Sequence, residues 1–410
     1  MRTVEQHLEQ ILDVVSPLAP LTRPLTEVGG CRLACDVVSD TSLPPFANSS
    51  MDGYAVRSVD LAGAAPVSPV VLPVAGEIPA GSPARYALAP GHAYRIMTGA
   101  PIPVGADAVV AQEDTDQGLA RVSITRAPQP HAYVRDAGSD VTAGTTVVRE
   151  GAVLGPRTVA LLAATGHPRV LVYPRPRVVV VSTGSELREP GTGLAHGQIN
   201  DSNSYMLAAA VAAAGGVPYR VGPVDDDPRT LRELLADQLV RADALVTSGG
   251  VSVGAYDVVR DVLARMGTVW FGPVAMQPGK PQGFGTVGED AVPVFALPGN
   301  PVSSYVSFEV FVRPALRRMR ALATLQRPPA SGRWAHEGQS PPGRRQYVRV
   351  SLQAPGRAGA DVVVHAAGGP SSHLLGGLAG ADALAVVPEH VTRIRRGDPV
   401  TLLVLDDVDD

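Results

Sequence analysis

Residues 177–187, RVVVVSTGSEL, indicate the fold of the largest part of this 410-residue chain. Their four consecutive valines are typical of a strand buried on both faces, because a half-buried strand alternates apolar and polar side chains. The run ends in Ser, Thr and Gly, which are turn residues, and Glu186 follows directly. Such a strand predicts a parallel sheet covered by helices on both sides.

The segments after this strand repeat its pattern as far as residue 319. Residues 242–250 and 291–299 are two more apolar runs that end in glycine. Helical periodicity fills the intervals, and the predicted helices are 201–216, 227–240, 256–267 and 302–319. Asp227 followed by Pro228 is a typical helix start. The alternation predicts an α/β/α domain with a doubly wound, mainly parallel sheet.

The flanking regions follow other patterns. Residues 4–15 have helical periodicity, and short strand-like runs separated by glycine and proline extend from about residue 41 to 140. Residues 158–166 predict one more helix, and the prolines of 173–178 indicate a stiff hinge. We interpret residues 327–332, RPPASG, as a linker to a small β domain at the end of the chain.

Composition argues against several classes of function. Lys plus Arg number 35 against 39 Asp plus Glu, so the chain has no general attraction for nucleic acid or anionic lipid. No apolar run approaches the ~18 residues of a membrane span, and the start does not resemble a signal peptide, so we expect a cytoplasmic protein. Cys31 and Cys35 have no second pair or nearby histidine to complete a zinc site, and we interpret both as reduced core thiols.

Three loops of the predicted sheet carry the candidate chemistry. They are STGSE (182–186), SGGVSVGAYD (248–257) and LPGNPVSS (297–304), and each combines glycine, hydroxyl side chains and a helix start. Ligands of an open parallel sheet bind outside the carboxyl ends of its strands, which is where these loops lie. Glycine lets a ligand approach the backbone closely, and helix N-termini attract phosphate or carboxylate. Each loop alone is equally consistent with a turn that ends a strand.

Other motifs favour or exclude particular classes of site and enzyme. Glu186, Asp227 and Asp257 fall on the same predicted edge and could hold a divalent cation with substrate phosphates, although helix capping alone would explain Asp227. No Walker loop, dinucleotide fingerprint or histidine metal motif is present. Residues 250–254 match the G-x-S-x-G pattern of serine hydrolases. We disfavour that class because the later histidines all fall in the β tail, namely His336, His365, His373 and His390.

Seven motifs in order give the chain a resemblance to a known family. They are PPFANSSMDGYAVR (44–57), RIMTGAPIPVGADAVV (95–110), VVVSTGSEL (179–187), GQINDSNSYML (197–207), SGGVSVGAYD (248–257), PGKPQGFG (278–285) and LPGNPVSS (297–304). From about residue 4 to its end, the chain resembles the molybdopterin molybdenumtransferases, whose animal relative is the gephyrin E domain.

This resemblance implies a homodimer whose subunits have four domains. Residues 1–40 and 141–175 would form a discontinuous N-terminal helical and linking domain, and 41–140 an inserted β-rich arm domain. Residues 176–325 would be the molybdopterin-binding α/β/α domain, and 326–410 a small C-terminal β-barrel.

The resemblance also implies the reaction and its residues. Members insert molybdate into adenylated molybdopterin and release AMP, with a divalent cation such as Mg²⁺. The implied catalytic residues are Asp52, Thr98, Asp140, Glu186, Asp257 and Lys280, of which Glu186 and Asp257 would also bind the metal. The implied substrate-binding residues are Ser182, Thr183, Gly184, Asp227, Ser248, Gly249, Gly250, Ser252, Gly254, Pro298, Gly299, Asn300, Pro301, Arg345 and Ser372. The implied protein partners are the molybdopterin adenylyltransferase and the molybdoenzymes that receive the cofactor.

Two positions depart from the family pattern, and two other functions compete. Gln277 stands where many members have a second lysine, which would make the anion pocket less positive, and Ser185 replaces a common aspartate beside Glu186, which would change the cation site. A molybdopterin adenylyltransferase would share the α/β domain but lack the arm and the barrel. A non-catalytic molybdopterin-binding scaffold is disfavoured because nothing in the chain resembles an additional fused domain.

Overall fold

The computed structural model describes residues 1–251, 258–353 and 361–405. The chain divides into two compact units. The first unit consists of Met1–Leu21, Gly30–Arg32 and Tyr173–Asp410, and the second of Thr22–Gly29 and Leu33–Val172.

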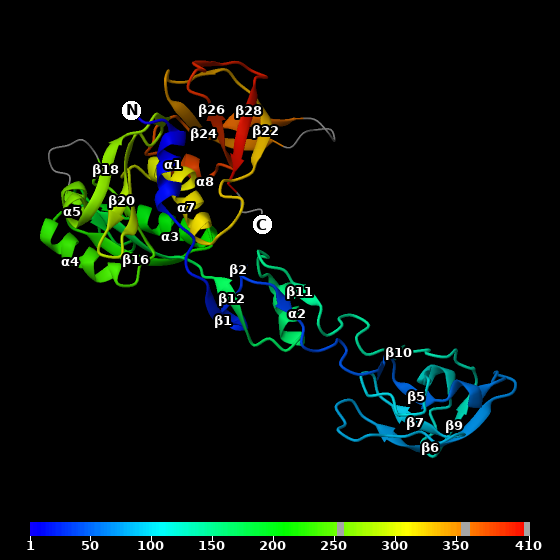
Figure 1. Ribbon diagram of the computed structural model, residues 1–410. Coiled ribbons are helices and arrows are strands. Elements are labelled where there is room, and N and C mark those ends of the chain that lie inside the picture. The colour runs from blue at the N-terminus through cyan, green and yellow to red at the C-terminus, as the bar shows by residue number, and fades with distance from the viewer. Residues whose placement is uncertain (252–257, 354–360, 406–410) are drawn as a thin grey trace. The chain divides into compact units, whose positions relative to one another are not determined.

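The first unit contains a six-stranded sheet of order β16-β13-β17-β21-β20-β18 (Figure 1). Its strands are β13 (Arg177–Thr183), β16 (Val217–Val224), β17 (Ala244–Ser248), β18 (Gly267–Pro273), β20 (Pro281–Val287) and β21 (Val292–Leu297). The neighbours β16, β13, β17 and β21 run parallel, and the sequence predicts β13, β17 and β21 among them. Strand β20 is antiparallel to both of its neighbours, and the sequence analysis did not identify β16, β18 or β20. Their glycines and prolines obscure the strand pattern.

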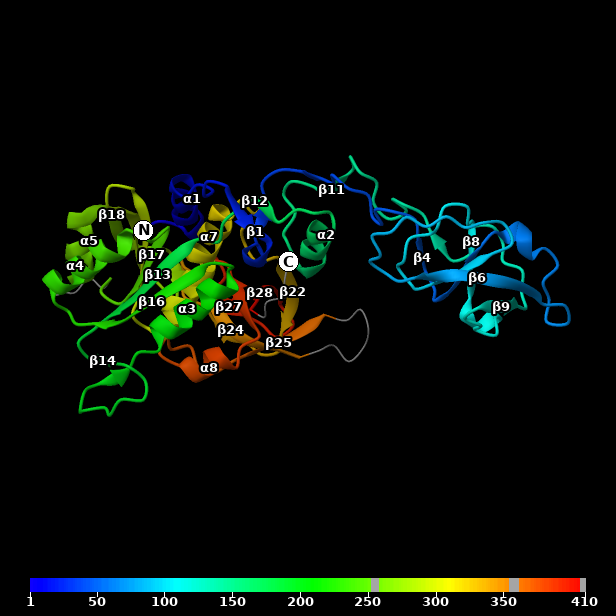
Figure 2. The same ribbon diagram turned by 90° about the horizontal axis from the view of Figure 1, so that it is seen from below.

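Helices cover both faces of this sheet (Figures 1 and 2). One face carries α1 (Val4–Val14), α3 (Asn203–Ala213), α6 (Pro301–Ser307), the π-helical η4 (Phe308–Val312) and α7 (Arg313–Met319). The other face carries α4 (Pro228–Leu239) and α5 (Val258–Met266). Val178 and Val180 of β13 join the first core, whereas Val179 and Val181 join the second. The run of valines therefore serves two cores at once, which explains why it shows no alternation.

The last predicted helix, 302–319, is present as α6, η4 and α7 in succession. Pro314 is the second residue of α7, which continues the helix from η4, where a proline lacks the N–H donor and crowds the carbonyl of the residue four positions earlier. That residue, Val310, lies in the π-helical segment. The wider π turn accommodates the proline without ending the helix.

The C-terminal strands close into a five-stranded barrel, as expected. They are β22 (Pro329–Trp334), β24 (Arg345–Gln353), β25 (Val362–Ala366), β26 (Ala383–Val387) and β28 (Pro399–Val404), and the pairing of β24 with β26 closes the ring. The interpretation of 327–332 as a linker was wrong, because Pro329 begins β22, which pairs with β25 and β28. A proline is tolerated at the first residue of a strand. Short elements complete the unit: β14 (Leu187–Arg188), β15 (Ile199–Asn200), β19 (Met276–Gln277), β23 (Gly338–Gln339), α8 (Leu375–Ala379) and β27 (Arg393–Ile394).

The second unit is built mainly of short strands, as the glycine and proline spacing predicts. Its five-stranded sheet has the order β8-β5-β7-β6-β9, with β5 (Gly53–Val56), β6 (Val70–Ile78), β7 (Ala93–Ile96), β8 (Ala108–Ala111) and β9 (Arg121–Ile124). A three-stranded sheet joins β1 (Leu21–Pro24), β12 (Arg169–Tyr173) and β2 (Arg32–Leu33). The remaining elements are η1 (Leu25–Glu27), β3 (Val37–Val38), β4 (Asn48–Ser49), η2 (Ser58–Leu61), η3 (Gln112–Asp114), β10 (Val134–Arg135), β11 (Thr146–Val148) and α2 (Pro156–Ala164).

Neither Cys31 nor Cys35 forms a disulfide, which agrees with reduced thiols. Cys31 is buried, but Cys35 is exposed, so the expectation of a core position was wrong for Cys35. In the part of the chain that the structure describes, no helix has the length and apolar character needed to cross a membrane.

Candidate active site

A cavity of about 820 Å³ lies in the first unit at the carboxyl ends of β13, β17 and β21. This size lies within the usual range of ligand sites. Its lining includes Thr183, Gly184, Glu186, Asp201, Ser202, Asn203, Asp226, Gly249, Gly250, Pro281, Pro298, Gly299, Asn300, Pro301 and His373. The structure thus brings together the three loops that the sequence analysis selected.

Two glycines make this edge possible. Gly249 has a φ of +99°, and a Cβ there would lie 2.7 Å from the Thr183 carbonyl oxygen. Gly184 has a φ of +152°, and a Cβ there would lie 2.6 Å from Glu186 Oε2. Any larger residue would separate β17 from β13 or displace the Glu186 carboxylate.

Asn203, at the start of α3, ties two of the loops together. Its Nδ2 donates to Ser248 Oγ at 2.8 Å and to the Gly299 carbonyl at 2.7 Å. The sequence analysis did not select Asn203 as a site residue, although it lies in the quoted 197–207 motif. Its position in a polar run, just before an apolar helix, was the available signal.

Several buried polar atoms around the cavity have no hydrogen-bond partner among the described residues. They are Ser182 Oγ, Thr183 Oγ1, Asn203 Oδ1 and Thr247 Oγ1. Thr183 lines the cavity and is only 6% exposed. Buried polar groups are nearly always paired, so a cluster of unpaired ones is typical of a functional site.

Three carboxylates line the cavity, and none of its lining residues in the described ranges is lysine or arginine. Asp201 accepts hydrogen bonds from Ser204 N and Oγ, and Ser185 N donates to Asp226 Oδ2 at 3.3 Å. The Glu186 carboxylate has no hydrogen-bond partner within the described residues, in which no group of three His, Cys, Asp or Glu side chains is arranged to hold a metal ion. One or two carboxylates still suit Mg²⁺, which is usually shared with substrate phosphates.

Residues 225–228, DDDP, confirm the predicted helix start but leave Asp227 out of the cavity lining. Asp227 Oδ2 accepts a hydrogen bond from Thr230 N at 2.7 Å and caps α4. Hydrogen bonds with the side chain and the backbone N–H of Thr230 lower the pKa of Asp227. Asp226, not Asp227, lines the cavity. Three other predicted site residues, Ser252, Gly254 and Asp257, lie outside the described residues.

Lys280 stands beside the cavity, because it precedes Pro281, which lines it. Its side chain is exposed. Lys280 is also the single lysine of the sequence, and all the other residues counted as Lys plus Arg are arginines. This unequal usage singles out Lys280 in the sequence, and its role in binding stays a prediction. Arg345, another predicted residue, forms ion pairs with Glu5 and Glu389.

A loop of the barrel reaches the cavity. Ser372 Oγ accepts a hydrogen bond from Asn300 Nδ2 at 3.0 Å, and its carbonyl accepts one from Val302 N. The next residue, His373, lines the cavity together with Gly250. The sequence argument that set the tail histidines apart from the sheet edge was therefore wrong for His373.

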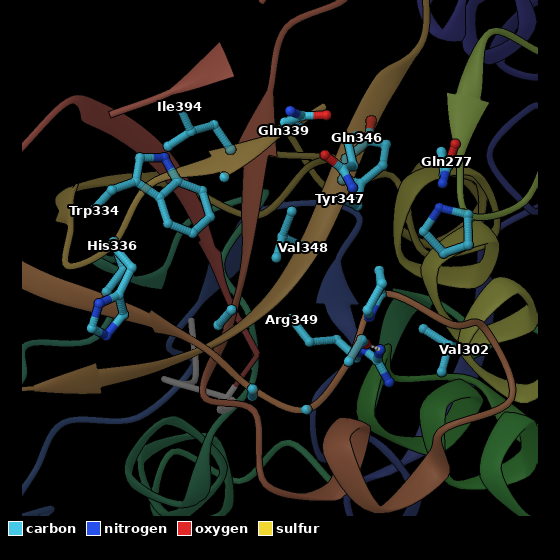
Figure 3. Close-up of a pocket in the computed structure, with 18 of the residues that line it drawn as sticks. Gln277, Val302, Trp334, His336, Gln339, Gln346, Tyr347, Val348, Arg349 and Ile394 are labelled. Atoms are coloured by element: carbon cyan, nitrogen blue, oxygen red, sulfur yellow. Dashed lines mark hydrogen bonds between the residues drawn. The ribbon is translucent and has the colours of Figure 1, made fainter. Parts of the chain in front are cut away.

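Arg349 fixes the loop of residues 369–374 through its guanidinium group. Arg349 is 5% exposed, and its guanidinium donates to the carbonyls of Gly369, Ser371 and Leu374, the last at 2.6 Å. Arg349 also borders a smaller cavity of about 190 Å³ (Figure 3). In that view Trp334, His336 and Ile394 lie on one side, and Gln277 and Val302 on the other. The cationic group of Arg349 already binds the carbonyls of this loop, so the larger cavity is the better candidate for a substrate site.

The second unit holds the remaining predicted residues. Asp52 precedes β5, and its Oδ1 accepts hydrogen bonds from Thr98 N at 2.7 Å and Thr98 Oγ1 at 2.9 Å. These two bonds lower the pKa of Asp52. Asp140 is exposed. The structure brings Asp52 and Thr98 into contact, and the catalytic roles of all three residues stay predictions.

The sequence matches three family models along most of its length. Residues 2–166 match the "MoeA N-terminal region (domain I and II)", 179–318 the "Probable molybdopterin binding domain" and 332–405 the "MoeA C-terminal region (domain IV)".

Named relatives cover nearly the whole chain. A Mycobacterium tuberculosis H37Rv protein named molybdopterin molybdenumtransferase 2 is 46% identical over 403 residues, covering 97% of this chain and 98% of its own. A Nostoc molybdopterin molybdenumtransferase is 40% identical over 385 residues, covering 93% and 88%. The crystal structure of a molybdopterin biosynthesis MoeA protein from Pyrococcus horikoshii superposes with a TM-score of 0.75 at 32% identity, covering 98% of both chains.

Proposed function

The chain belongs to the molybdopterin molybdenumtransferase family, and from this premise we propose that it inserts molybdate into adenylated molybdopterin with release of AMP. It is thus a transferase of molybdenum cofactor biosynthesis. The observation that supports the proposed substrate best is the cavity at the strand ends, where three glycine-rich loops and unpaired polar atoms converge.

Two kinds of group in this chain suit anionic substrates, namely donors that bind oxyanions and carboxylates that hold a cation. Backbone N–H groups of the glycine-rich loops and the Lys280 ammonium would bind phosphate or molybdate oxygens. Glu186 and Asp257 would hold Mg²⁺ with the substrate phosphates. When bound, the cation supplies positive charge where the phosphoanhydride breaks. The Gly184 turn keeps the Glu186 carboxylate at the cavity edge.

Further parts of the proposal rest on the family resemblance. They are the homodimer, the four-domain division, the cytoplasmic location, and encounters with the adenylyltransferase and with recipient molybdoenzymes. The catalytic roles of Asp52, Thr98 and Asp140 have the same basis.

The reaction can be tested directly with purified protein, adenylated molybdopterin, Mg²⁺ and molybdate. We expect molybdate-dependent AMP release and stoichiometric molybdenum in the pterin, measured in the same samples. Adenylation of free molybdopterin by ATP would instead indicate an adenylyltransferase. Binding of molybdopterin without either product would indicate a scaffold.

Asp52→Asn tests the contribution of the second unit. Asparagine keeps an acceptor oxygen for Thr98, so the turn before β5 should persist, while the negative charge is lost. We expect molybdenum insertion to be abolished and the circular dichroism spectrum to stay unchanged. Asp136→Asn, at another exposed carboxylate of the same unit, is the matched control. Wild-type activity of Asp52→Asn would reduce Asp52 to a turn residue.

A further inference from the structure

The larger cavity is short of positive charge for the substrates it is proposed to take. Glu186, Asp201 and Asp226 line it, and its described lining includes no lysine or arginine. The sequence 252–257, SVGAYD, adds no basic residue to the neighbouring loop. Carboxylates in an enclosed site repel a phosphate unless nearby donors or cations offset them.

His373 is the lining residue in the described ranges that can carry a positive charge. Its side chain is exposed, so a ligand in the cavity can reach the ring. A neutral imidazole still donates one N–H, and the protonated ring donates two, so either form can bind a phosphate oxygen.

The loop that carries His373 is fixed from both sides. Asn300 Nδ2 and Val302 N bind the preceding residue, Ser372, and thereby join the loop to the start of α6. The buried Arg349 guanidinium binds the carbonyls of Ser371 and Leu374, on either side of His373. A side chain on a loop held in this way loses little entropy when it binds a ligand.

We propose that His373 is a substrate-binding residue that donates a hydrogen bond to a phosphate group of the substrate in the larger cavity. The inference rests on the proposed function, because it takes adenylated molybdopterin as the ligand. Two phosphates share the required chemistry, namely the phosphate of the adenylate and that of molybdopterin. Binding experiments with the two separated halves distinguish these sources.

The experiment measures the affinities of AMP, adenosine and non-adenylated molybdopterin for His373→Leu, His373→Arg and the wild type by titration calorimetry. Leucine cannot donate a hydrogen bond, and arginine always can. We expect His373→Leu to bind the relevant phosphate ligand about tenfold more weakly, the usual size for loss of a hydrogen bond to a charged group. Adenosine affinity should change less than twofold, and His373→Arg should retain phosphate affinity. His390→Leu, at an exposed histidine of the barrel outside the cavity lining, is the control.

Each outcome decides the proposal. A loss of affinity for AMP alone indicates that His373 binds the adenylate phosphate. A loss of affinity for molybdopterin alone indicates that it binds the molybdopterin phosphate. Either result supports the proposal. Unchanged affinities for both ligands overturn it. Equal losses for AMP and adenosine also overturn it, because they would indicate a displaced loop. If the wild type binds neither AMP nor molybdopterin, the proposed function itself fails, and the inference fails with it.

Discussion

Two regions of the first unit each contain a buried polar atom without a hydrogen-bond partner in the described chain, and they tolerate it for different reasons. One is Nδ1 of His7 on α1, and the other is Oγ1 of Thr183 at the end of β13. His7 is 1% exposed and packs against Trp270, Phe284 and Phe311, with ring centroids 4.7 Å apart for Phe311. Thr183 lines the larger cavity.

In the core around His7, the unpaired nitrogen is accommodated because the ring stays neutral. Burial, with a smaller contribution from Arg2, lowers the pKa of His7 to about 4. At the cavity edge, the unpaired atoms form a cluster beside a space large enough for a substrate. An unpaired buried atom therefore indicates function only where a cavity and further polar groups accompany it.

The largest expected effect is at the cavity. Glu186→Gln keeps the size of the side chain but removes its charge, so it should lower molybdenum insertion by about a hundredfold. The thermal midpoint should stay within a degree or two, because the carboxylate has no partner among the described residues. Steady-state AMP release measures the first quantity and scanning calorimetry the second.

Glu337→Gln sharpens this result as a matched control. Glu337 lines the smaller cavity, and its ion pair with Arg393 is solvent-exposed at 3.5 Å. Exposed pairs contribute little to stability, so both activity and midpoint should remain near wild type. Equal losses of activity in the two variants would contradict our choice of the larger cavity.

The next effect concerns the core and depends on pH. The unfolded chain binds a proton at His7 near pH 6.5, whereas the native chain does so only near pH 4. Stability from the neutral ring is therefore present above pH 6.5 and decreases as the pH falls toward 4. Between pH 7.5 and 5, His7 should lower the free energy of unfolding by about 2 kcal/mol.

His7→Leu should remove this part of the pH dependence. Urea denaturation at the two pH values measures it, and fluorescence reports on the first unit because Trp270 and Trp334 both belong to it. The KM of the variant should not change, since His7 lies in the core. An unchanged difference between the two pH values would show that His7 does not titrate as described.

The smallest expected effect concerns Thr183 at the cavity edge, where stability and substrate affinity should change in opposite directions. Thr183→Val replaces the unpaired hydroxyl with a methyl group of nearly the same shape, so the free energy of unfolding should rise by about 1 kcal/mol. Substrate affinity should fall about fivefold if the hydroxyl serves the ligand. A gain in stability without any loss of substrate affinity would indicate that the unpaired Thr183 hydroxyl, like the unpaired nitrogen of His7, does not bind a ligand.

Local patterns predicted much of the first unit. The valine run, the helix periodicities and the Asp227-Pro228 start correspond to β13, the helices and the cap of α4. The pattern failed for β16, β18, β20 and β22, where glycines and prolines hide strands that are stabilised by pairing with distant partners. Strand propensity depends on such neighbours more than on the residues themselves.

The candidate site was predicted only as far as chain order allows. The rule that loops follow parallel strands selected Gly184, Gly249 and Gly299, and these residues do line one cavity. The sequence identified Asp227 as the cap of α4, which is confirmed, but it did not select the preceding Asp226, which lines the cavity, because that position depends on how the loop after β16 folds. Nor could it place His373, which is brought to the cavity from the barrel.

The strand–helix alternation, the glycine-rich loops and, through the ordered motifs, the family can be read from the chain alone, because these properties lie in neighbouring residues. It takes the folded protein to show that Asn203 joins two loops, that Arg349 fixes the loop of His373, and that the described cavity lining has unpaired polar atoms and no lysine or arginine. These features depend on contacts between residues up to about a hundred positions apart. Hydrogen bonds between such residues require a particular geometry but produce no repeating pattern in the sequence.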